Sequence, residues 1–144
     1  MGKIAVRLDT DQHRSLARWA TDCAEHVLPT FERVCPDDDR PRRAVEAARA
    51  WATGELSAGA ARDAAFAAHD AARETADPAA AAAARAAGHA AATAHVAGHA
   101  AHAATYAATA ASAAEPADPA AAAEERRWQL ARLPRGLGRA AFPG

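Results

Sequence analysis

Alanine fills so much of this chain that it restricts the possible folds more than any motif does. About a third of all residues are alanine, and the stretch 79–114 contains little else. Alanine is the strongest helix former, whereas the β-branched residues that strands prefer are scarce here. The chain is therefore expected to be all-α. Its high alanine content and its preference for arginine over lysine also indicate a GC-rich bacterial genome.

Capping residues, proline and glycine divide the chain into five expected helices. The first begins near Asp9 to Asp11, and Pro29 should kink or break it because proline lacks the amide donor. The others are expected from Pro41 to about Ala52, from an N-cap at Ser57 to about Ala76, from Pro78 to about Ala114, and from Asp118-Pro119 to about Leu133. Between the last two, Glu115-Pro116-Ala117 is the expected break.

Short loops and one-sided apolar stripes predict a single-domain antiparallel helical bundle of about five helices, one of them long and alanine-rich. The bundle is expected over residues 1–133, followed by an extended or frayed tail over 134–144 that is rich in Gly, Pro and Arg. Large apolar side chains are few, so these should dominate the core: Trp19, Leu28, Phe31, Trp51, Phe66 and Trp128.

Charge and hydropathy argue against several classes of partner. The formal net charge is −1, from 17 Lys and Arg against 18 Asp and Glu, so the basic excess of a nucleic-acid-binding domain is missing. No uninterrupted apolar run reaches the ~20 residues of a membrane span. Residues 1–5 do not begin a signal peptide, so a cytoplasmic location is expected. Cys23 and Cys35 form no CxxC pair and are expected to be buried thiols rather than a disulfide.

Histidines form the only unusual cluster. His89, His95, His99 and His102 lie in the long alanine-rich segment, and His95, His99 and His102 share one face if that segment is a single helix. With Gly88, Ala92, Tyr106 and Thr109 they step by four and three, the spacing of a helix–helix contact seam. The competing interpretation is a metal site that uses His95, His99, His102 and His69. No carboxylate lies within the segment to complete such a site, so we expect a packing seam and no metal.

No residue pattern indicates catalysis. The serines lack a nucleophile-elbow context, Cys23 falls on an apolar stripe, and no Gly-rich phosphate loop occurs. The run Glu124-Glu125-Arg126-Arg127 is interpreted as a solvated helix face. We therefore expect neither catalytic residues nor a cofactor.

One charged segment is a candidate for partner recognition. An acidic turn runs directly into a basic helix start, and the candidate residues are Asp37, Asp38, Asp39, Arg40, Arg42 and Arg43. Such a run can recognise a protein partner, and it can also be a solvated loop with a helix cap.

Four segments resemble a known bacterial family. They read HVLPTFE at 26–32, DRPRRAVEAARAW at 39–51, GEL at 54–56 and AGHAAATAHVAGHA at 87–100. The sequence is similar to immunity proteins related to the fifth immunity class of polymorphic toxin systems, over roughly residues 13–133. The resemblance implies an all-helical protein that binds and neutralises a cognate protein toxin, and it supplies no catalytic residues.

Two alternatives to toxin binding stay open at this point. One is a metal- or small-ligand-binding helical protein that uses the histidines of the alanine-rich segment. The other is a helical scaffold or oligomerisation module, which would assemble as a homo-oligomer.

Overall fold

The computed structural model describes residues 7–114 and 116–143, and over these residues the chain is helical with no strand. The helices are α1 (Thr10–Val34), α2 (Arg40–Ala52), α3 (Ala58–Glu74), α4 (Pro78–Ala92), α5 (His99–Ala113), α6 (Ala120–Arg132) and α7 (Gly138–Ala141). The all-α prediction is confirmed, whereas the described residues form seven helices where about five were expected. Residues 1–6, at the start of the expected bundle, and Glu115, in the expected break, lie outside the described residues.

Three helix starts lie where the capping residues predicted them. Asp9 and Gln12 form a capping box, in which the Gln12 amide donates to Asp9 at 2.8 Å and the Asp9 amide donates back at 3.0 Å. Ser57 accepts from the amide of Ala60, and Asp77 accepts from the amide of Ala80. Each bond satisfies a donor left free in the first helical turn, so it depends only on residues three positions apart.

Pro29 does not break the first helix. α1 continues through it to Val34, and Pro29 itself is exposed. Leu28 and Phe31, on either side of the proline, are fully buried. Burial of these two large side chains outweighs the single hydrogen bond that the proline removes, so the helix is retained.

The prediction of a single helix over residues 78–114 is wrong, because this segment folds back on itself as two helices, α4 and α5. The reversal occupies residues 93–98, and the Thr93 hydroxyl donates to the carbonyl of His89 at 2.9 Å as α4 ends. One continuous helix would extend roughly 55 Å and leave much of its alanine surface without a neighbour. Folded as a hairpin, the two halves bury their alanine faces against each other.

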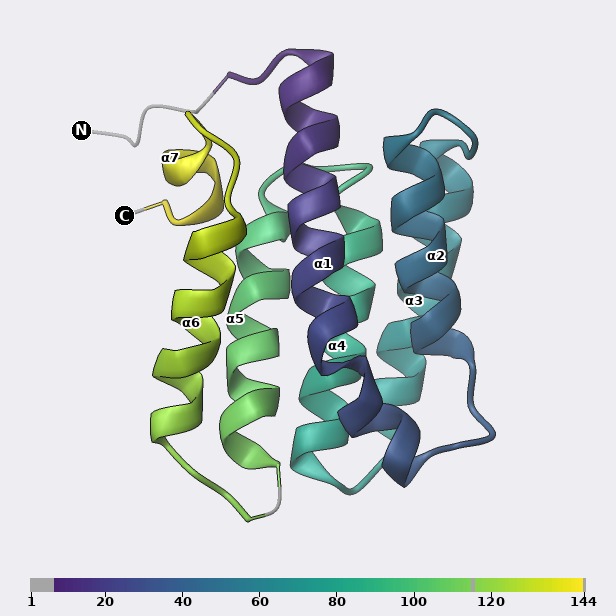
Figure 1. Ribbon diagram of the computed structural model, residues 1–144. Helices are drawn as coiled ribbons and strands as arrows, with labels where there is room; N and C mark the ends of the chain where they lie inside the picture. Colours follow the sequence, from purple (N-terminus) through teal and green to yellow (C-terminus); the bar gives the residue numbers. More distant parts are fainter. Residues whose placement is uncertain (1–6, 115, 144) are drawn as a thin grey trace, which may run out of the picture.

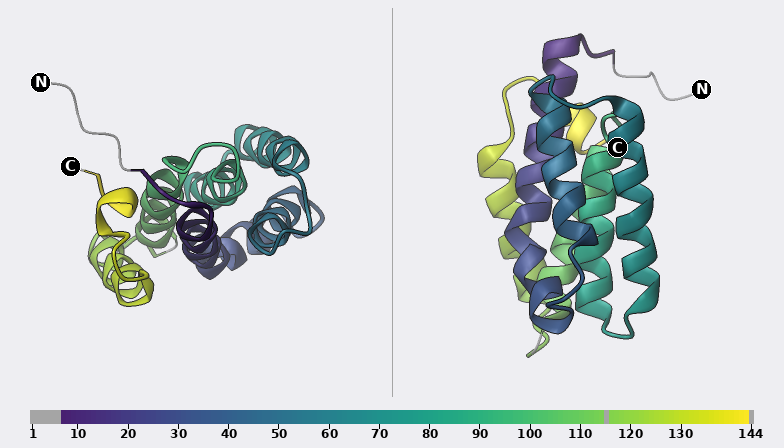
Figure 2. Two further views of the ribbon diagram at one scale, coloured as in Figure 1. Left: turned by 90° about the horizontal axis from the view of Figure 1, so that it is seen from above. Right: turned by 90° about the vertical axis from the view of Figure 1, so that its right-hand side faces the viewer.

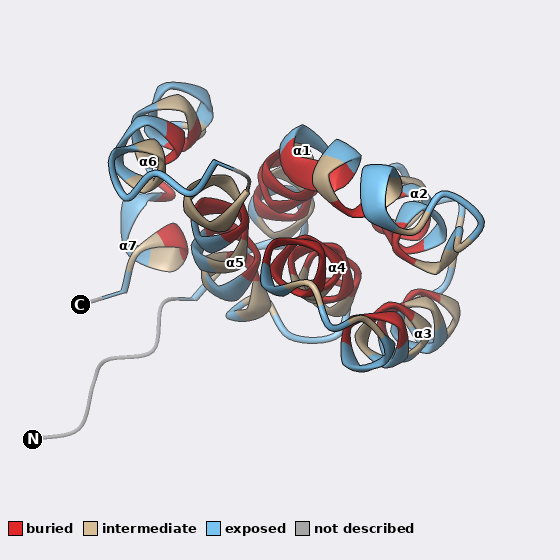
Figure 3. Ribbon diagram, turned by 90° about the horizontal axis from the view of Figure 1, so that it is seen from below, coloured by how far each residue is buried: buried red, intermediate tan, exposed pale blue. Residues whose placement is uncertain are grey.

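α4 is the central helix of the bundle. It packs against α1, α2, α3 and α5, and seen from below it lies in the middle of the molecule, almost entirely buried (Figure 3). Helices α1 to α6 alternate in direction, with α1 between α6 and α2 in the view of Figure 1. The end-on view in Figure 2 places α6 at one edge, where it packs mainly on α5. α4 is apolar on nearly all sides, and such a helix is stable only when other helices enclose it.

Of the six side chains expected to dominate the core, three are buried, two are half-buried and one is exposed. Trp19, Leu28 and Phe31 are buried, whereas Phe66 is 56 % exposed on the outer face of α3, beneath the guanidinium of Arg62. α3 packs through small side chains instead, among them Ala61, Ala65, Ala68 and Ala72. Alanine faces bring helix axes close together, which leaves no room for a phenyl ring between them. Trp51 and Trp128 are half-buried.

The chain after Leu133 does not run on as an extended tail. It forms the short helix α7, in which Ala141 is buried, and Leu137 just before it is 2 % exposed. Phe142 packs edge-on against Trp19, with ring centroids 5.5 Å apart, and lies under the guanidinium of Arg126. Part of the segment 134–144 therefore completes the core beside α1.

None of the helices in the described residues is both long enough and apolar enough to traverse a lipid bilayer.

Candidate functional site

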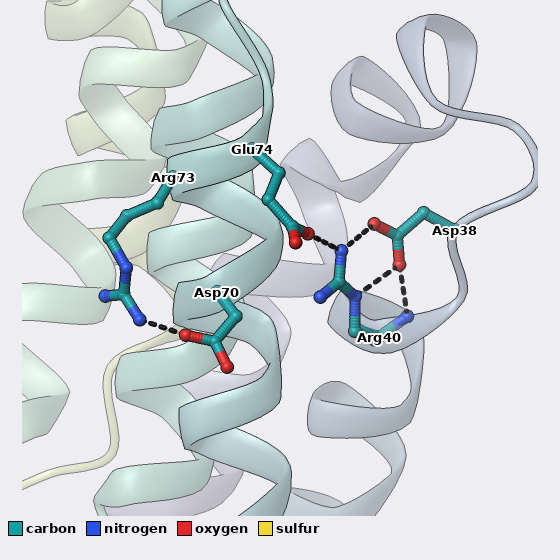
Figure 4. A network of polar contacts seen from close by, with 5 residues as sticks. All are labelled: Asp38, Arg40, Asp70, Arg73 and Glu74. Carbon is teal, nitrogen blue, oxygen red and sulfur yellow. Dashed lines mark hydrogen bonds and ion pairs between the residues drawn. The ribbon is translucent and has the colours of Figure 1, made fainter.

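The acidic–basic segment, residues 37–43, is tied into the fold by ion pairs. Arg40 donates two hydrogen bonds to the carboxylate of Asp38, at 2.9 and 2.7 Å, and also contacts Glu74 of α3 (Figure 4). Arg42 holds Glu32 of α1 through two bonds of 2.6 and 2.7 Å. The segment thus links the ends of α1, α2 and α3.

These hydrogen bonds change the acid–base behaviour of the carboxylates. Bonding to Arg40 holds the pKa of Asp38 below its ordinary value, and bonding to Arg42 does the same for Glu32. Arg43 pairs with Asp39 at 2.8 Å, while Asp37 is exposed. Of the six candidate partner-binding residues, five therefore form ion pairs within the chain, and Asp37 forms none among the described residues.

A histidine cluster, defined as His69, His89, His99 and His102, joins α3, α4 and α5. The Nδ1 atoms of His89 and His99 are hydrogen-bonded at 2.9 Å, and the ring of His69 meets that of His89 edge-on at 4.9 Å. Two residues of α5 also contact His89. The ring centroid of His102 lies 5.1 Å from that of His89, and Tyr106 stacks on His89 with ring centroids 5.3 Å apart. His89 is the centre of the cluster.

Gly88 makes room for this arrangement. A Cβ atom at residue 88 would lie 2.7 Å from two atoms of the His69 ring, closer than real Cβ contacts allow. Burial lowers the pKa of His89 to about 3, assisted by the neighbouring His69, His99 and His102. Burial also lowers the pKa values of His69 and His99. The lowered pKa values favour the neutral forms of His69, His89 and His99 at neutral pH.

The predicted contact seam is wrong in its membership, because the segment that was expected to form one helix forms α4 and α5. His95 lies in the turn between α4 and α5 and is exposed, so it does not share a face with His99 and His102. His89 and His69 take its place in the cluster. Among residues 7–114 and 116–143, no three His, Cys, Asp or Glu side chains are arranged to hold a metal ion. The exchange of His95 for His89 follows from the reversal at 93–98, which no local signal marked.

A groove between α1 and α6 is the feature that the sequence reasoning missed. It has a volume of about 380 Å³ and is lined by Asp22, Glu25, His26, Trp128 and Arg132. The imidazole of His26 lies flat on the indole of Trp128, with centroids 3.7 Å apart and planes 3° apart. The guanidinium of Arg132 lies 4.4 Å from the centre of the same indole.

Glu125, the hydrogen-bond partner of the groove residue His26, is buried, which corrects the interpretation of residues 124–127 as a solvated face. Its side chain is 7 % exposed and accepts a hydrogen bond from Nδ1 of His26 at 2.6 Å. Gln129, one turn further along α6, is fully buried and donates to the carbonyl of Ala104 at 2.8 Å. α6 thus faces the bundle with polar side chains whose hydrogen bonds are satisfied, a pattern that charge alone does not reveal.

A second hollow adjoins the groove on the other side of α1. It has a volume of about 300 Å³ between α1 and α2, and Glu25 lines both hollows. Arg49 of α2 lies 3.5 Å from Asp22 and 3.3 Å from Glu25, so one guanidinium serves two carboxylates. Glu46 and Glu55 also line this hollow, and neither has an ion-pair partner among the described residues.

Both cysteines are free thiols, as expected, but only Cys23 is buried, whereas Cys35 is half-buried. Cys23 is fully buried in α1, and burial raises the pKa of its thiol. A protonated, enclosed thiol is a poor nucleophile, so Cys23 acts as a small core residue.

Comparison with known proteins gives one informative result. No match was found among curated proteins or among solved structures. Residues 7–136 match the family described as "Imm-5 like putative immunity protein", a range that includes α1 to α6. Since the match covers most of the chain, this protein belongs to the Imm-5 like immunity protein family.

Proposed function

We propose that this protein binds a cognate bacterial toxin of a polymorphic toxin system and neutralises it by forming a stoichiometric complex. The observation that carries the proposal is the family match over residues 7–136. An immunity protein of this kind acts through surface complementarity and anchoring side chains rather than by catalysing a reaction.

The surface geometry supports a binding role. Arg42 is held in a two-pronged contact with Glu32, and His26 is held between Glu125 and Trp128. Side chains that are already ordered lose little conformational entropy when a partner docks, so more of the contact energy becomes affinity.

The acidic–basic segment has a subsidiary part in this proposal. Its paired charges hold the ends of α1, α2 and α3 together, while the exposed Asp37 faces solvent. Exposed charges at the rim of an interface mainly change the rate at which partners meet. We assign residues 37–43 to such a rim.

Co-expression tests the proposal. The protein should restore growth to cells that produce the toxin domain encoded beside its gene, and the two should co-elute at equal stoichiometry in gel filtration. Rescue of growth without a detectable complex would contradict neutralisation by binding.

A further inference from the structure

His26, which lines the groove between α1 and α6, is paired with a buried acid, Glu125 of α6. Glu125 is 7 % exposed, and enclosing a carboxylate costs free energy unless a partner compensates. Its partner is the imidazole of His26, whose side chain is 40 % exposed. A buried acid is thus used to hold a surface histidine in one orientation.

The same histidine fixes the aromatic wall of the groove. His26 covers one region of the Trp128 indole in parallel stacking, and Arg132 lies over the ring at 4.4 Å. Trp128 is half-buried, so part of the indole remains accessible beside the groove. Tryptophan and arginine held rigidly next to a hollow are typical of the residues that dominate binding energy at protein interfaces.

The opposite wall is acidic and incompletely neutralised. Asp22 and Glu25 share Arg49 at 3.5 and 3.3 Å, longer than the 2.6 and 2.7 Å contacts between Arg42 and Glu32. Across the ridge of α1, Glu46 and Glu55 add two more carboxylates to the adjoining hollow. The two hollows are lined by four carboxylates, those of Asp22, Glu25, Glu46 and Glu55, and by the guanidinium groups of Arg42, Arg49 and Arg132. Because Arg42 is already paired with Glu32, the face carries a net negative charge, which complements positive charge on a partner.

We propose that this face, formed by the groove and the adjoining hollow on either side of α1, is the toxin-binding surface, and that a basic segment of the toxin lies along it. A Lys or Arg side chain of the toxin enters the groove between the carboxylates of Asp22 and Glu25 and the indole of Trp128. The inference rests on the proposed function and adds the surface and the chemistry of the partner. Figure 1 shows the three helices concerned, with α1 between α6 and α2.

Binding kinetics with the toxin domain encoded beside the gene test this surface. The variant D22K/E25K reverses two charges on the wall and should weaken binding about tenfold or more, and it should lose the salt dependence shown by the unaltered protein. Trp128→Ala should raise the dissociation rate about thirtyfold, the loss expected for an anchoring tryptophan. Matched control D63K/D70K reverses two exposed acids on α3, which lines neither hollow, and should bind within about twofold of the unaltered protein.

The outcomes separate this inference from the function on which it rests. If the unaltered protein does not bind the toxin domain, both fall. If it binds and D22K/E25K binds equally well, the surface is wrong while the function stands. Circular dichroism checks that each variant folds; D22K/E25K alters only partly exposed positions and decides the matter even if Trp128→Ala unfolds. Hydrogen exchange on the toxin gives a further test, because a protected segment without Lys or Arg would overturn the proposed chemistry.

Discussion

The imidazole ring of His69 occupies the space that a side chain at Gly88 would need. A Cβ at residue 88 would lie 2.7 Å from Cε1 and Nε2 of His69. The glycine of α4 thus admits the histidine of α3 to the cluster around His89. Several consequences of this and other contacts can be measured.

Gly88→Ala should destabilise the protein even though alanine favours helix by roughly 1 kcal/mol over glycine. The added methyl group must displace the His69 ring, which loses its contact with His89. Chemical denaturation should show a loss of about 1 kcal/mol. Gly59→Ala, where a Cβ would meet no atom closer than 4.0 Å, is the matched control and should be neutral or stabilising. In an H69A background, Gly88→Ala should become stabilising; if it destabilises there too, His69 is not the cause.

Acid should destabilise the fold through the histidine cluster. The pKa of His89 is lowered to about 3, and those of His69 and His99 are also lowered, mainly by burial. The unfolded chain, with histidine pKa values near 6.5, therefore binds more protons below that pH. The free energy of unfolding should be highest above about pH 6.5 and should fall between pH 6.5 and 3. Nearby Arg73 and Arg85 reinforce the shift at His69, and Asp70 opposes it.

Substitution of single histidines isolates this contribution. His89→Gln should flatten the decline in stability between about pH 7 and 5, above the range where Asp38 and Glu32 titrate. His95→Gln, in the exposed turn, should leave the decline unchanged. Equal pH profiles for the two variants would remove the cluster as the origin of the acid sensitivity.

Purified, tag-free protein is expected to carry no stoichiometric zinc, iron, nickel or copper. Among the residues that the structure describes, no three His, Cys, Asp or Glu side chains are placed to share one ion, and the hydrogen bond at 2.9 Å between His89 and His99 already engages the Nδ1 atom of each ring. Elemental analysis should find substoichiometric metal, and a chelator should leave the melting temperature unchanged. Near-stoichiometric metal that is lost, together with stability, in H89A/H99A would contradict this.

Two phenylalanines should respond oppositely to truncation. Phe31→Ala should cost about 3–5 kcal/mol, because it empties a fully buried site. Phe66→Ala should change the free energy of unfolding by less than about 1 kcal/mol, because the ring is 56 % exposed and contacts mainly Arg62. Urea denaturation of both variants distinguishes this core from the one expected from the sequence, in which both rings are buried.

The ion pairs around Arg40 should contribute modestly. Arg40→Gln removes contacts with Asp38 and Glu74 and should lower stability by up to about 1 kcal/mol, an effect that shrinks as salt is added. Arg43→Gln, which breaks the more exposed pair with Asp39, should have almost no effect. A salt-independent loss at Arg40 would indicate that packing rather than charge links α2 to α3.

Family membership and the helix starts could be predicted from the sequence because their signals are local. Asp9, Ser57 and Asp77 cap helices through atoms three residues away, and the stripe from Leu16 to Phe31 repeats with the helical period. The similarity of residues 26–56 to the immunity family rests likewise on the order of residues. None of these depends on where the rest of the chain lies.

Tertiary structure decided three features: the reversal at 93–98, the exposure of Phe66 and the burial of Glu125. Alanine has nearly the same preference at every position of a helix, so a run of it does not show where one helix should become two. Which side of α3 faces inward depends on how closely α4 can approach. The alanine side of α3 faces inward, and the ring of Phe66 is exposed. The carboxylate of Glu125 is stable when buried because His26, 99 residues away in the sequence, donates a hydrogen bond to it. Partners so distant meet only once the bundle has formed, and so the groove and the histidine cluster, unlike the caps, exist only in the folded protein.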